Sequence, residues 1–181
     1  MSKLFSATAV PVIETERLVL RGHRLDDFAD SLALWTDPGS VRFIGGKPST
    51  REEVWARMLR YAGHWSLLGF GYWVVTDRET GRFVGEVGFG NFKRDIDPSL
   101  DGMPEIGWVL AGDQHGRGYA TEAARAAIAW GEAHFGPVRT ACIIAPENEP
   151  SIRVAEKCGY REFCRTAYKD NPTIMFVRDS V

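Results

Sequence analysis

Hydrophobic and polar residues alternate along some stretches of this chain and recur at helical spacing along others. Residues 17–21, Arg-Leu-Val-Leu-Arg, alternate in the way typical of a strand. Residues 25–35 carry apolar side chains at helical spacing, which predicts a helix that ends before residue 37. Thr50 is followed three residues later by Glu53. This capping-box pattern predicts a second helix, from residue 51 to about Gly69.

The rest of the chain alternates between strand and helix patterns. Strands are predicted at 72–76, 83–89, 105–110, 140–145, 160–169 and 173–178, and helices at 119–135 and 148–159. Residues 92–104 are polar and irregular, and residues 1–14 are expected to be a loose lead-in. This order predicts one α+β domain over residues 1–181, with helices flanking a mixed central sheet of about seven strands.

Composition narrows the class of protein. The net charge is −2, from 22 basic and 24 acidic residues. No bulk field would therefore hold nucleic acid or an anionic membrane. Three cysteines without CxxC spacing fit a reducing compartment better than disulfides or a zinc site, and no metal is expected. Residues 1–12 do not resemble a signal peptide, and no apolar run reaches the ~20 residues of a membrane span. A cytoplasmic protein is expected.

The segment 114–124 carries the strongest chemical signal. Gly116 and Gly118 directly precede the predicted 119–135 helix, so backbone N–H groups and the helix dipole can converge on one anion. A P-loop ending at Gly46-Lys47 is excluded, because it would need glycine at 41 and serine or threonine at 48. A dinucleotide fingerprint fits poorly, because its third glycine would be Thr121. The pyrophosphate of another cofactor stays open.

Four separated motifs in order resemble the GNAT N-acetyltransferase superfamily, over roughly residues 12–178. They are Glu14-Thr15-Glu16-Arg17-Leu18-Val19-Leu20-Arg21, Glu105-Ile106-Gly107-Trp108, Gly116-Arg117-Gly118-Tyr119-Ala120-Thr121-Glu122-Ala123, and Asn148-x-x-Ser151 continuing through Ala155-Glu156-Lys157-Cys158-Gly159-Tyr160. The first and second are similar to the branch typified by ribosomal-protein N-terminal acetyltransferases (Rim type).

The resemblance implies that acetyl-CoA binds as cosubstrate in a V-shaped cleft between the strands at 105–110 and 140–145. Backbone groups of the first strand, near Val109 or Leu110, would meet the thioester. Asn148 and Ser151 would lie by the pantetheine arm and the sulfur. The pyrophosphate would lie on the loop and first helical turn formed by His115, Gly116, Arg117, Gly118, Tyr119, Ala120 and Thr121.

Two positions depart from the family pattern. His115 stands where glutamine or arginine is usual, which should not prevent binding because backbone amides do most of the phosphate work. Ala155 replaces a tyrosine that protonates the departing thiolate in many members. The acid would then be Ser151, a water or no group at all, since a thiol of pKa ~8.5 leaves tolerably as a thiolate.

The sequence leaves the acceptor open. Glu105 is a candidate general base acting through water, with Glu86 a weaker rival and an exposed strand-edge residue the plain alternative. Trp108 is expected in the core or lining the acceptor pocket. The predicted reaction is acetyl transfer to a primary amine, of a protein N-terminus or a small molecule, by direct attack. A non-catalytic acyl-CoA sensor on the same scaffold is the rival reading, and a homodimer is left open.

Overall fold

The computed structural model describes residues 10–180, and their strands form one sheet of eight. The strand order is β1-β2-β3-β4-β5-β6-β8-β7. Neighbouring strands are antiparallel except β5 and β6, which are parallel. The strands are β1 Ile13–Glu14, β2 Leu18–Arg21, β3 Tyr72–Asp77, β4 Phe83–Gly90, β5 Glu105–Leu110, β6 Thr140–Ile144, β7 Arg161–Tyr168 and β8 Asn171–Arg178. The predicted α+β class with a mixed sheet is confirmed.

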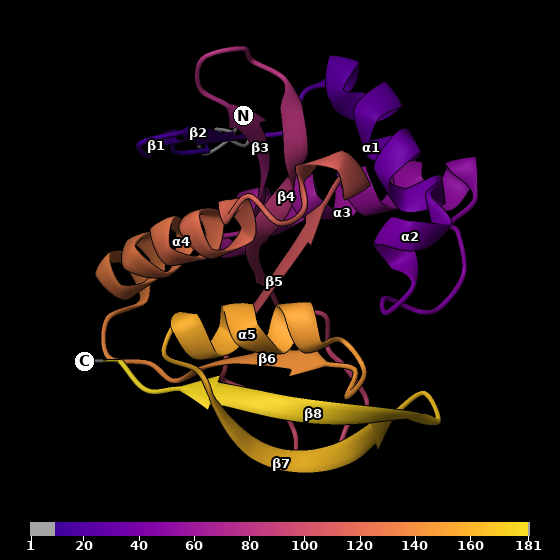
Figure 1. Ribbon diagram of the computed structural model, residues 1–181. Helices are drawn as coiled ribbons and strands as arrows, with labels where there is room; N and C mark the ends of the chain where they lie inside the picture. The colour runs from indigo at the N-terminus through magenta and orange to yellow at the C-terminus, as the bar shows by residue number, and fades with distance from the viewer. Residues whose placement is uncertain (1–9, 181) are drawn as a thin grey trace, which may run out of the picture.

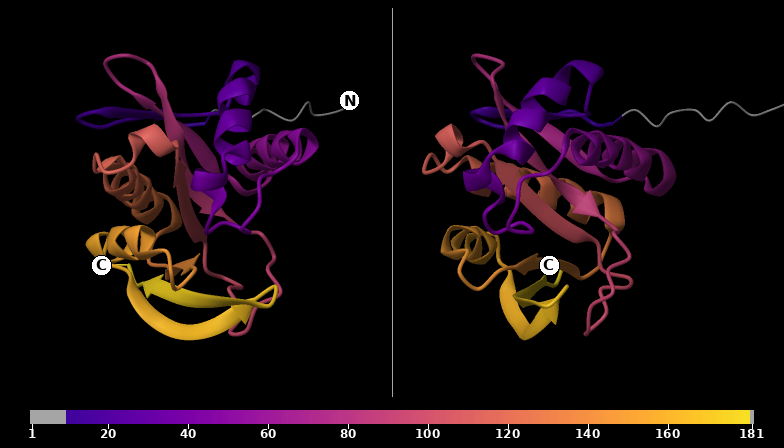
Figure 2. Two further views of the ribbon diagram at one scale, coloured as in Figure 1. Left: turned by 45° about the vertical axis from the view of Figure 1, so that its right-hand side comes forward. Right: turned by 90° about the vertical axis from the view of Figure 1, so that its right-hand side faces the viewer.

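Helices cover both faces of this sheet (Figures 1 and 2). They are α1 Phe28–Thr36, α2 Pro38–Val41, α3 Arg51–Leu68, α4 Tyr119–Phe135 and α5 Glu149–Lys157. Helices α4 and α5 lie on one face, whereas α1 and α3 lie on the other. No helix within residues 10–180 is long and apolar enough to cross a bilayer.

Helix boundaries follow the local signals in the sequence. At the start of α3, the Thr50 hydroxyl accepts from the Glu53 amide, and the Glu53 carboxylate accepts from the Thr50 amide. This reciprocal pair satisfies two amides that lack helical partners. Gly69 ends the helix with a φ of 75°. Helix α4 buries Ala123, Ala124 and Ala127 against the sheet, and these short side chains permit a close approach.

One short strand and one short helix of the structure were not predicted. The sheet has eight strands rather than about seven, because Ile13–Glu14 in the expected lead-in pairs with β2. Residues 1–9 of that lead-in lie outside the described residues. The chain after α1 also forms the short helix α2, where Asp37 caps the Ser40 amide and Pro38 supplies a first-turn φ. A two-residue strand and a four-residue helix are both too short for periodicity to reveal.

Candidate functional site

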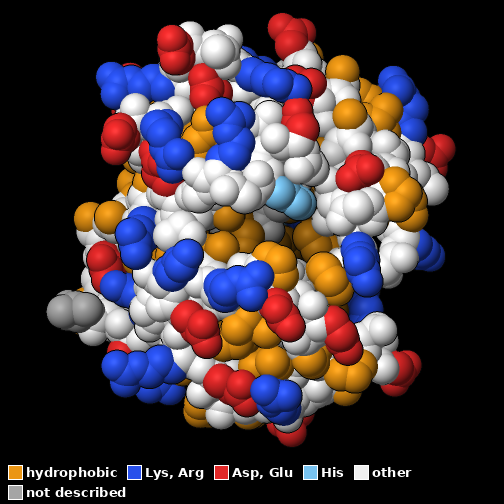
Figure 3. Space-filling view, viewed as in Figure 1, with side chains coloured by type: hydrophobic (Ala, Val, Ile, Leu, Met, Phe, Trp, Pro, Cys, Tyr) orange, Lys and Arg blue, Asp and Glu red, His pale blue; other side chains and the backbone are white. Residues whose placement is uncertain are grey.

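The site begins where the sheet opens between β5 and β6. Within residues 10–180, Glu105 and Ala141 are the one registered pair between these strands. The strands then separate, with α4 beside one and α5 beside the other (Figure 1). The surface is hollowed between α4 and α5, and hydrophobic side chains gather in the hollow (Figure 3).

The backbone of β5 turns alternate residues toward this opening. The Ala111 amide donates to the Val84 carbonyl, and Val109 lies opposite Glu86 in the register of β4 and β5. Because hydrogen-bonded and non-hydrogen-bonded pairs alternate in an antiparallel ladder, the Val109 backbone faces β4. The amides of Trp108 and Leu110 therefore face the opening. Of the two predicted thioester contacts, Leu110 presents its N–H to the opening and Val109 does not.

The glycine loop closes one end of the opening. Gly116 and Gly118 have φ values of 73° and 80°, where side-chain-bearing residues are strained. A Cβ on Gly116 would meet no atom within 4 Å, so the space above the loop is open. Gly118 caps α4, which leaves the amides of Tyr119, Ala120 and Thr121 without helical acceptors. The loop thus has the form of an anion cradle.

Arg17, in the turn between β1 and β2, holds the first turn of α4 and the glycine loop. Arg17 contacts both Glu122 oxygens, with Nε at 2.7 Å and Nη2 at 2.6 Å from Oε2 and its backbone N 2.9 Å from Oε1. Its Nη1 donates to the Arg117 carbonyl at 2.9 Å. Carbonyl and N–H point oppositely across a trans peptide, so this bond turns the Gly118 amide away from Arg17.

His115 and Tyr119 tie the loop to neighbouring strands. The Nε2 of His115 donates to the Leu110 carbonyl at 3.0 Å. The buried Tyr119 donates its hydroxyl proton to Asp77 at 3.0 Å. Hydrogen bonds from Thr80, with that from Tyr119, lower the pKa of Asp77 to about 2. Both contacts fix side chains that sequence reasoning had assigned to the cofactor.

Helix α5 brings a hydroxyl to the other side of the opening. Asn148 caps the helix by accepting from the Ser151 amide at 3.3 Å. The Ser151 Oγ accepts from Trp108 Nε1 at 3.3 Å, so its own proton can be donated elsewhere. Ala155, one turn further, is fully buried. Tyr160 is also buried, and its hydroxyl is paired with Thr140 at 2.7 Å.

Glu105 lies at the point where β5 and β6 meet, and it is paired. Arg94 donates to both carboxylate oxygens, at 2.6 Å from Nε and 2.7 Å from Nη2. The Glu105 side chain is only 7% exposed. Burial lowers the pKa of Arg94, but hydrogen bonds and charge from Glu105 outweigh burial and raise it overall. The Arg94 guanidinium also lies 4.9 Å from the ring centres of Phe92 and Tyr168.

Glu86, the rival base, is buried under α1. Its oxygens accept from Ser31 Oγ and Trp35 Nε1, each at 2.9 Å, and lie 3.4 Å from His23 Nε2. These contacts join α1 to β4. Beside them Tyr61 stacks on Tyr72 with ring centres 4.3 Å apart. Burial raises the pKa of both tyrosines.

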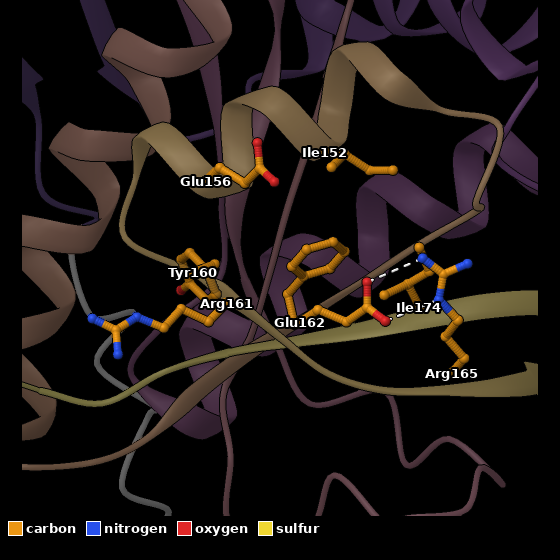
Figure 4. A pocket seen from close by; sticks show the side chains of 8 residues that line it. Ile152, Glu156, Tyr160, Arg161, Glu162, Arg165 and Ile174 are labelled. Carbon is orange, nitrogen blue, oxygen red and sulfur yellow. Dashed lines mark hydrogen bonds and ion pairs between the residues drawn. The ribbon is translucent and has the colours of Figure 1, made fainter.

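A second hollow lies between α5 and the β7–β8 hairpin (Figure 4). It measures about 450 Å³. Ile152, Ile174 and Phe176 line it, and the ion pair between Glu162 and Arg165 lies at its side. None of the residues predicted for the site line this hollow.

Several contacts of the site have no local signal in the sequence. Arg94 lies in the loop at 92–104 eleven residues before Glu105, and Trp108 lies 43 residues before Ser151. His23, which contacts Glu86, lies two residues after β2 and belongs to no recognisable sequence motif. Only the folded sheet brings these groups together. Among the described residues no group of His, Cys, Asp and Glu is arranged to hold a metal ion.

Comparisons with known proteins show which family and which folds this chain resembles. The family model described as acetyltransferase (GNAT) domain matches residues 17–161. The chain is 35% identical over 173 residues to the protein YkkB of Bacillus subtilis (strain 168), covering 92% of this chain and 94% of YkkB. The acetyltransferase from Agrobacterium tumefaciens str. C58 superposes with a TM-score of 0.81 at 26% identity, covering 98% of each chain.

A more distant structure shares the fold. It is RimL, the ribosomal L7/L12 alpha-N-protein acetyltransferase, in complex with coenzyme A. The TM-score is 0.72 at 15% identity, with 93% of this chain and 98% of RimL covered.

Proposed function

Because the chain belongs to the GNAT acetyltransferase family, we propose that it transfers the acetyl group of acetyl-CoA to a primary amine by direct attack. The observation that carries this proposal is the opening between β5 and β6. It combines unpaired backbone amides on one strand, an anion cradle at one end and a hydroxyl on the facing helix.

The residues present fit coenzyme A. The open space above Gly116 and the free amides of the first α4 turn suit a pyrophosphate. Asn148 and Ser151 lie beside the opening where a pantetheine arm would enter. RimL, which shares the fold, is in complex with coenzyme A. Acetyl-CoA would supply an activated acyl group, and this chain would hold and orient it.

The chain's own groups would act at two atoms. The Leu110 amide would donate to the thioester oxygen as negative charge develops there, an effect typically worth ~3–4 kcal/mol. Ser151 would donate a hydrogen bond to the sulfur, which leaves as a thiolate, while Trp108 holds the serine oxygen. The amine nitrogen forms the new bond to the acetyl carbon as the carbon–sulfur bond breaks, and the amine then loses a proton.

That proton needs an acceptor. Presenting a neutral amine at pH 7 costs ~1 kcal/mol for an α-amine and ~4–5 kcal/mol for a lysine-like amine. Glu105 is our candidate base, acting through a water. Arg94 occupies two of its roughly four lone-pair positions, so a water can still reach the carboxylate. Glu86 is the weaker candidate, because three side chains already surround it.

One observation favours the rival function of a non-catalytic acyl-CoA sensor. Ala155 offers no phenol to the sulfur. An acceptor screen separates the two functions: acetyl-CoA is incubated with a panel of amines, and both free thiol and acetylated product are measured. We expect thiol release that depends on an amine. Binding of acetyl-CoA without release for any amine would favour the sensor.

A further inference from the structure

Two arginines on α3, Arg57 and Arg60, lack acidic partners. Neither makes a salt bridge within the described part of the chain. The acid one turn before Arg57 is Glu53, whose carboxylate is taken by the Thr50 amide at 2.7 Å. The Arg57 guanidinium instead lies 3.6 Å from the centre of the Trp35 ring, and Arg60 lies 5.1 Å from that of Phe92.

Two buried nitrogens in the same region have no hydrogen-bond partner among the described residues. They are the Nε of Arg57 and the Nδ1 of His23. The His23 side chain is only 3% exposed, and its ring lies 5.4 Å from that of Tyr61. Arg57 also borders Tyr61, whose pKa it lowers against the larger effect of burial. Buried polar atoms in native proteins are normally satisfied, so the unpaired N–H of Arg57 points to an absent acceptor atom. The Nδ1 of His23 carries a lone pair when Nε2 donates to Glu86, so it calls for no acceptor.

This region is connected to β5 through two stacked tyrosines. Tyr61 stacks on Tyr72 at an interplanar angle of 6°. The Tyr72 hydroxyl lies against Gly107, since a Cβ there would fall 2.2 Å from that oxygen. Gly107 directly precedes Trp108, whose amide faces the opening. The arginines therefore lie on the face of β5 opposite α4 and α5, with the rings of Tyr61 and Tyr72 between them and the strand.

We infer that Arg57 and Arg60 bind a carboxylate of the acceptor, so that the substrate is a primary amine that also carries an acidic group. This inference rests on the proposed acetyl transfer and names its substrate class. A guanidinium fork matches a carboxylate in shape and charge. The acceptor's carboxylate would lie at the α3 arginines beside Tyr61, and its amine would point toward β5.

Charge in the loop at 92–104, which leads into β5, agrees with a zwitterionic acceptor. In the loop at 92–104, Lys93 pairs with Asp101 and Arg94 pairs with Glu105. Asp95 and Asp97 are then the acids of that loop without a salt bridge in the described structure. They would favour the cationic amine end, while the α3 arginines would favour the anionic end.

Binding measured by calorimetry tests the inference without requiring turnover. The enzyme saturated with coenzyme A is titrated with α-amino acids and their α-amides, and with peptides that differ only in Asp or Asn as second residue. These arms separate a free α-carboxylate from an acidic side chain. In one of the two comparisons, amino acids against their α-amides or Asp peptides against Asn peptides, the acid should bind about 10- to 100-fold more tightly. Equal binding of both acids and their amides would overturn the inference.

Variants assign the preference to the arginines. Arg57→Gln and Arg60→Gln, singly and together, should remove the preference for acids and leave coenzyme A affinity unchanged. Arg57→Lys should also lose the preference for acids, because a lysine has no planar guanidinium to bind both carboxylate oxygens. Arg139→Gln is the control. Arg139 is exposed, directly precedes β6 and pairs with Asp179, away from α3. A preference that persists in the double variant would also overturn the inference.

Two safeguards keep the outcomes distinct. Arg57 packs on Trp35, so an Arg57 variant could fail to fold. In that case the inference is tested by Arg60→Gln and by the ratio of acid to amide affinity in the unaltered enzyme. Free thiol is measured in the same series. If acids bind selectively but no amine is acetylated, the proposed transfer fails while the carboxylate site stands.

Discussion

Ser151 and Glu105 show how single side chains at the opening are held by partners far along the chain. Trp108 fixes the Ser151 oxygen, and Arg94 fixes the Glu105 carboxylate. The sequence predicted both residues from motifs. It could not predict their partners, because each pairing depends on where loops and strands meet after folding.

Removal of the Ser151 hydroxyl should slow the chemical step modestly. Ser151→Ala should lower kcat roughly tenfold with little change in acetyl-CoA affinity, because a thiolate of pKa ~8.5 still departs unaided. Steady-state kinetics with chemistry rate-limiting measure this effect. Ser66→Ala, on the exposed face of α3, is the control. An unchanged kcat would remove Ser151 from the role of acid.

Glu105 and Arg94 allow a base to be distinguished from a structural clamp. Both Glu105→Gln and Arg94→Gln break a largely buried pair and should lower the free energy of unfolding by about 2–3 kcal/mol. Only Glu105→Gln removes the base, so kcat/KM for the amine should fall ~10²–10⁴-fold in that variant alone. The loss should shrink as pH approaches the acceptor's own pKa. Equal losses of kcat/KM in the two variants would identify a clamp.

At the scale of elements, the start of α4 was the most predictable part of the site. Two glycines before a helix of small residues predicted the turn and the helix start, because those properties are local. Anion binding at the cradle stays a prediction. The support from the turn between β1 and β2 was not predictable in the same way. Arg17 and Thr15 reach Glu122 from more than one hundred positions earlier in the chain.

The support of the cradle by Arg17 can be tested through its partner. Glu122→Gln should weaken the hold on Arg17, loosen the Arg117–Gly118 peptide and raise the KM for acetyl-CoA about tenfold, with kcat nearly unchanged. Glu162→Gln is a matched control, because Glu162 forms an exposed pair with Arg165 on β7, away from the cradle. A fall in kcat at constant KM would show that this pair does not act through the cradle.

At the scale of the whole molecule, the alternation of strands and helices predicted the mixed sheet and its flanking helices. The pattern could not give the point at which β5 and β6 part. That point depends on the single registered pair at Glu105 and Ala141, within strands whose apolar residues look alike. Arg57 was also not predicted as a site residue, because helical spacing predicts the buried stripe of α3 and not which polar side chains lie beside it.

Binding of acetyl-CoA should stabilise the folded protein as a unit. At one hundred times the dissociation constant, ligand binding adds ~2.7 kcal/mol, which corresponds to roughly 5–10 °C in Tm for a chain of this size. Gly118→Asp should fold but lose this shift, because a carboxylate and a strained φ would occupy the cradle. Thermal unfolding with and without acetyl-CoA measures the Tm shift of the unaltered protein and its loss in Gly118→Asp. A full shift in that variant would place the pyrophosphate elsewhere.

The most direct test of the central claim is to follow the acetyl group itself. Isotopically labelled acetyl-CoA is incubated with the enzyme and each amine of the acceptor panel, and label and free thiol are counted together. We predict that, for at least one amine, labelled amide and free coenzyme A accumulate in equal amounts over many turnovers. Acetyl-CoA that binds at the opening yet stays intact with every amine would contradict the claim.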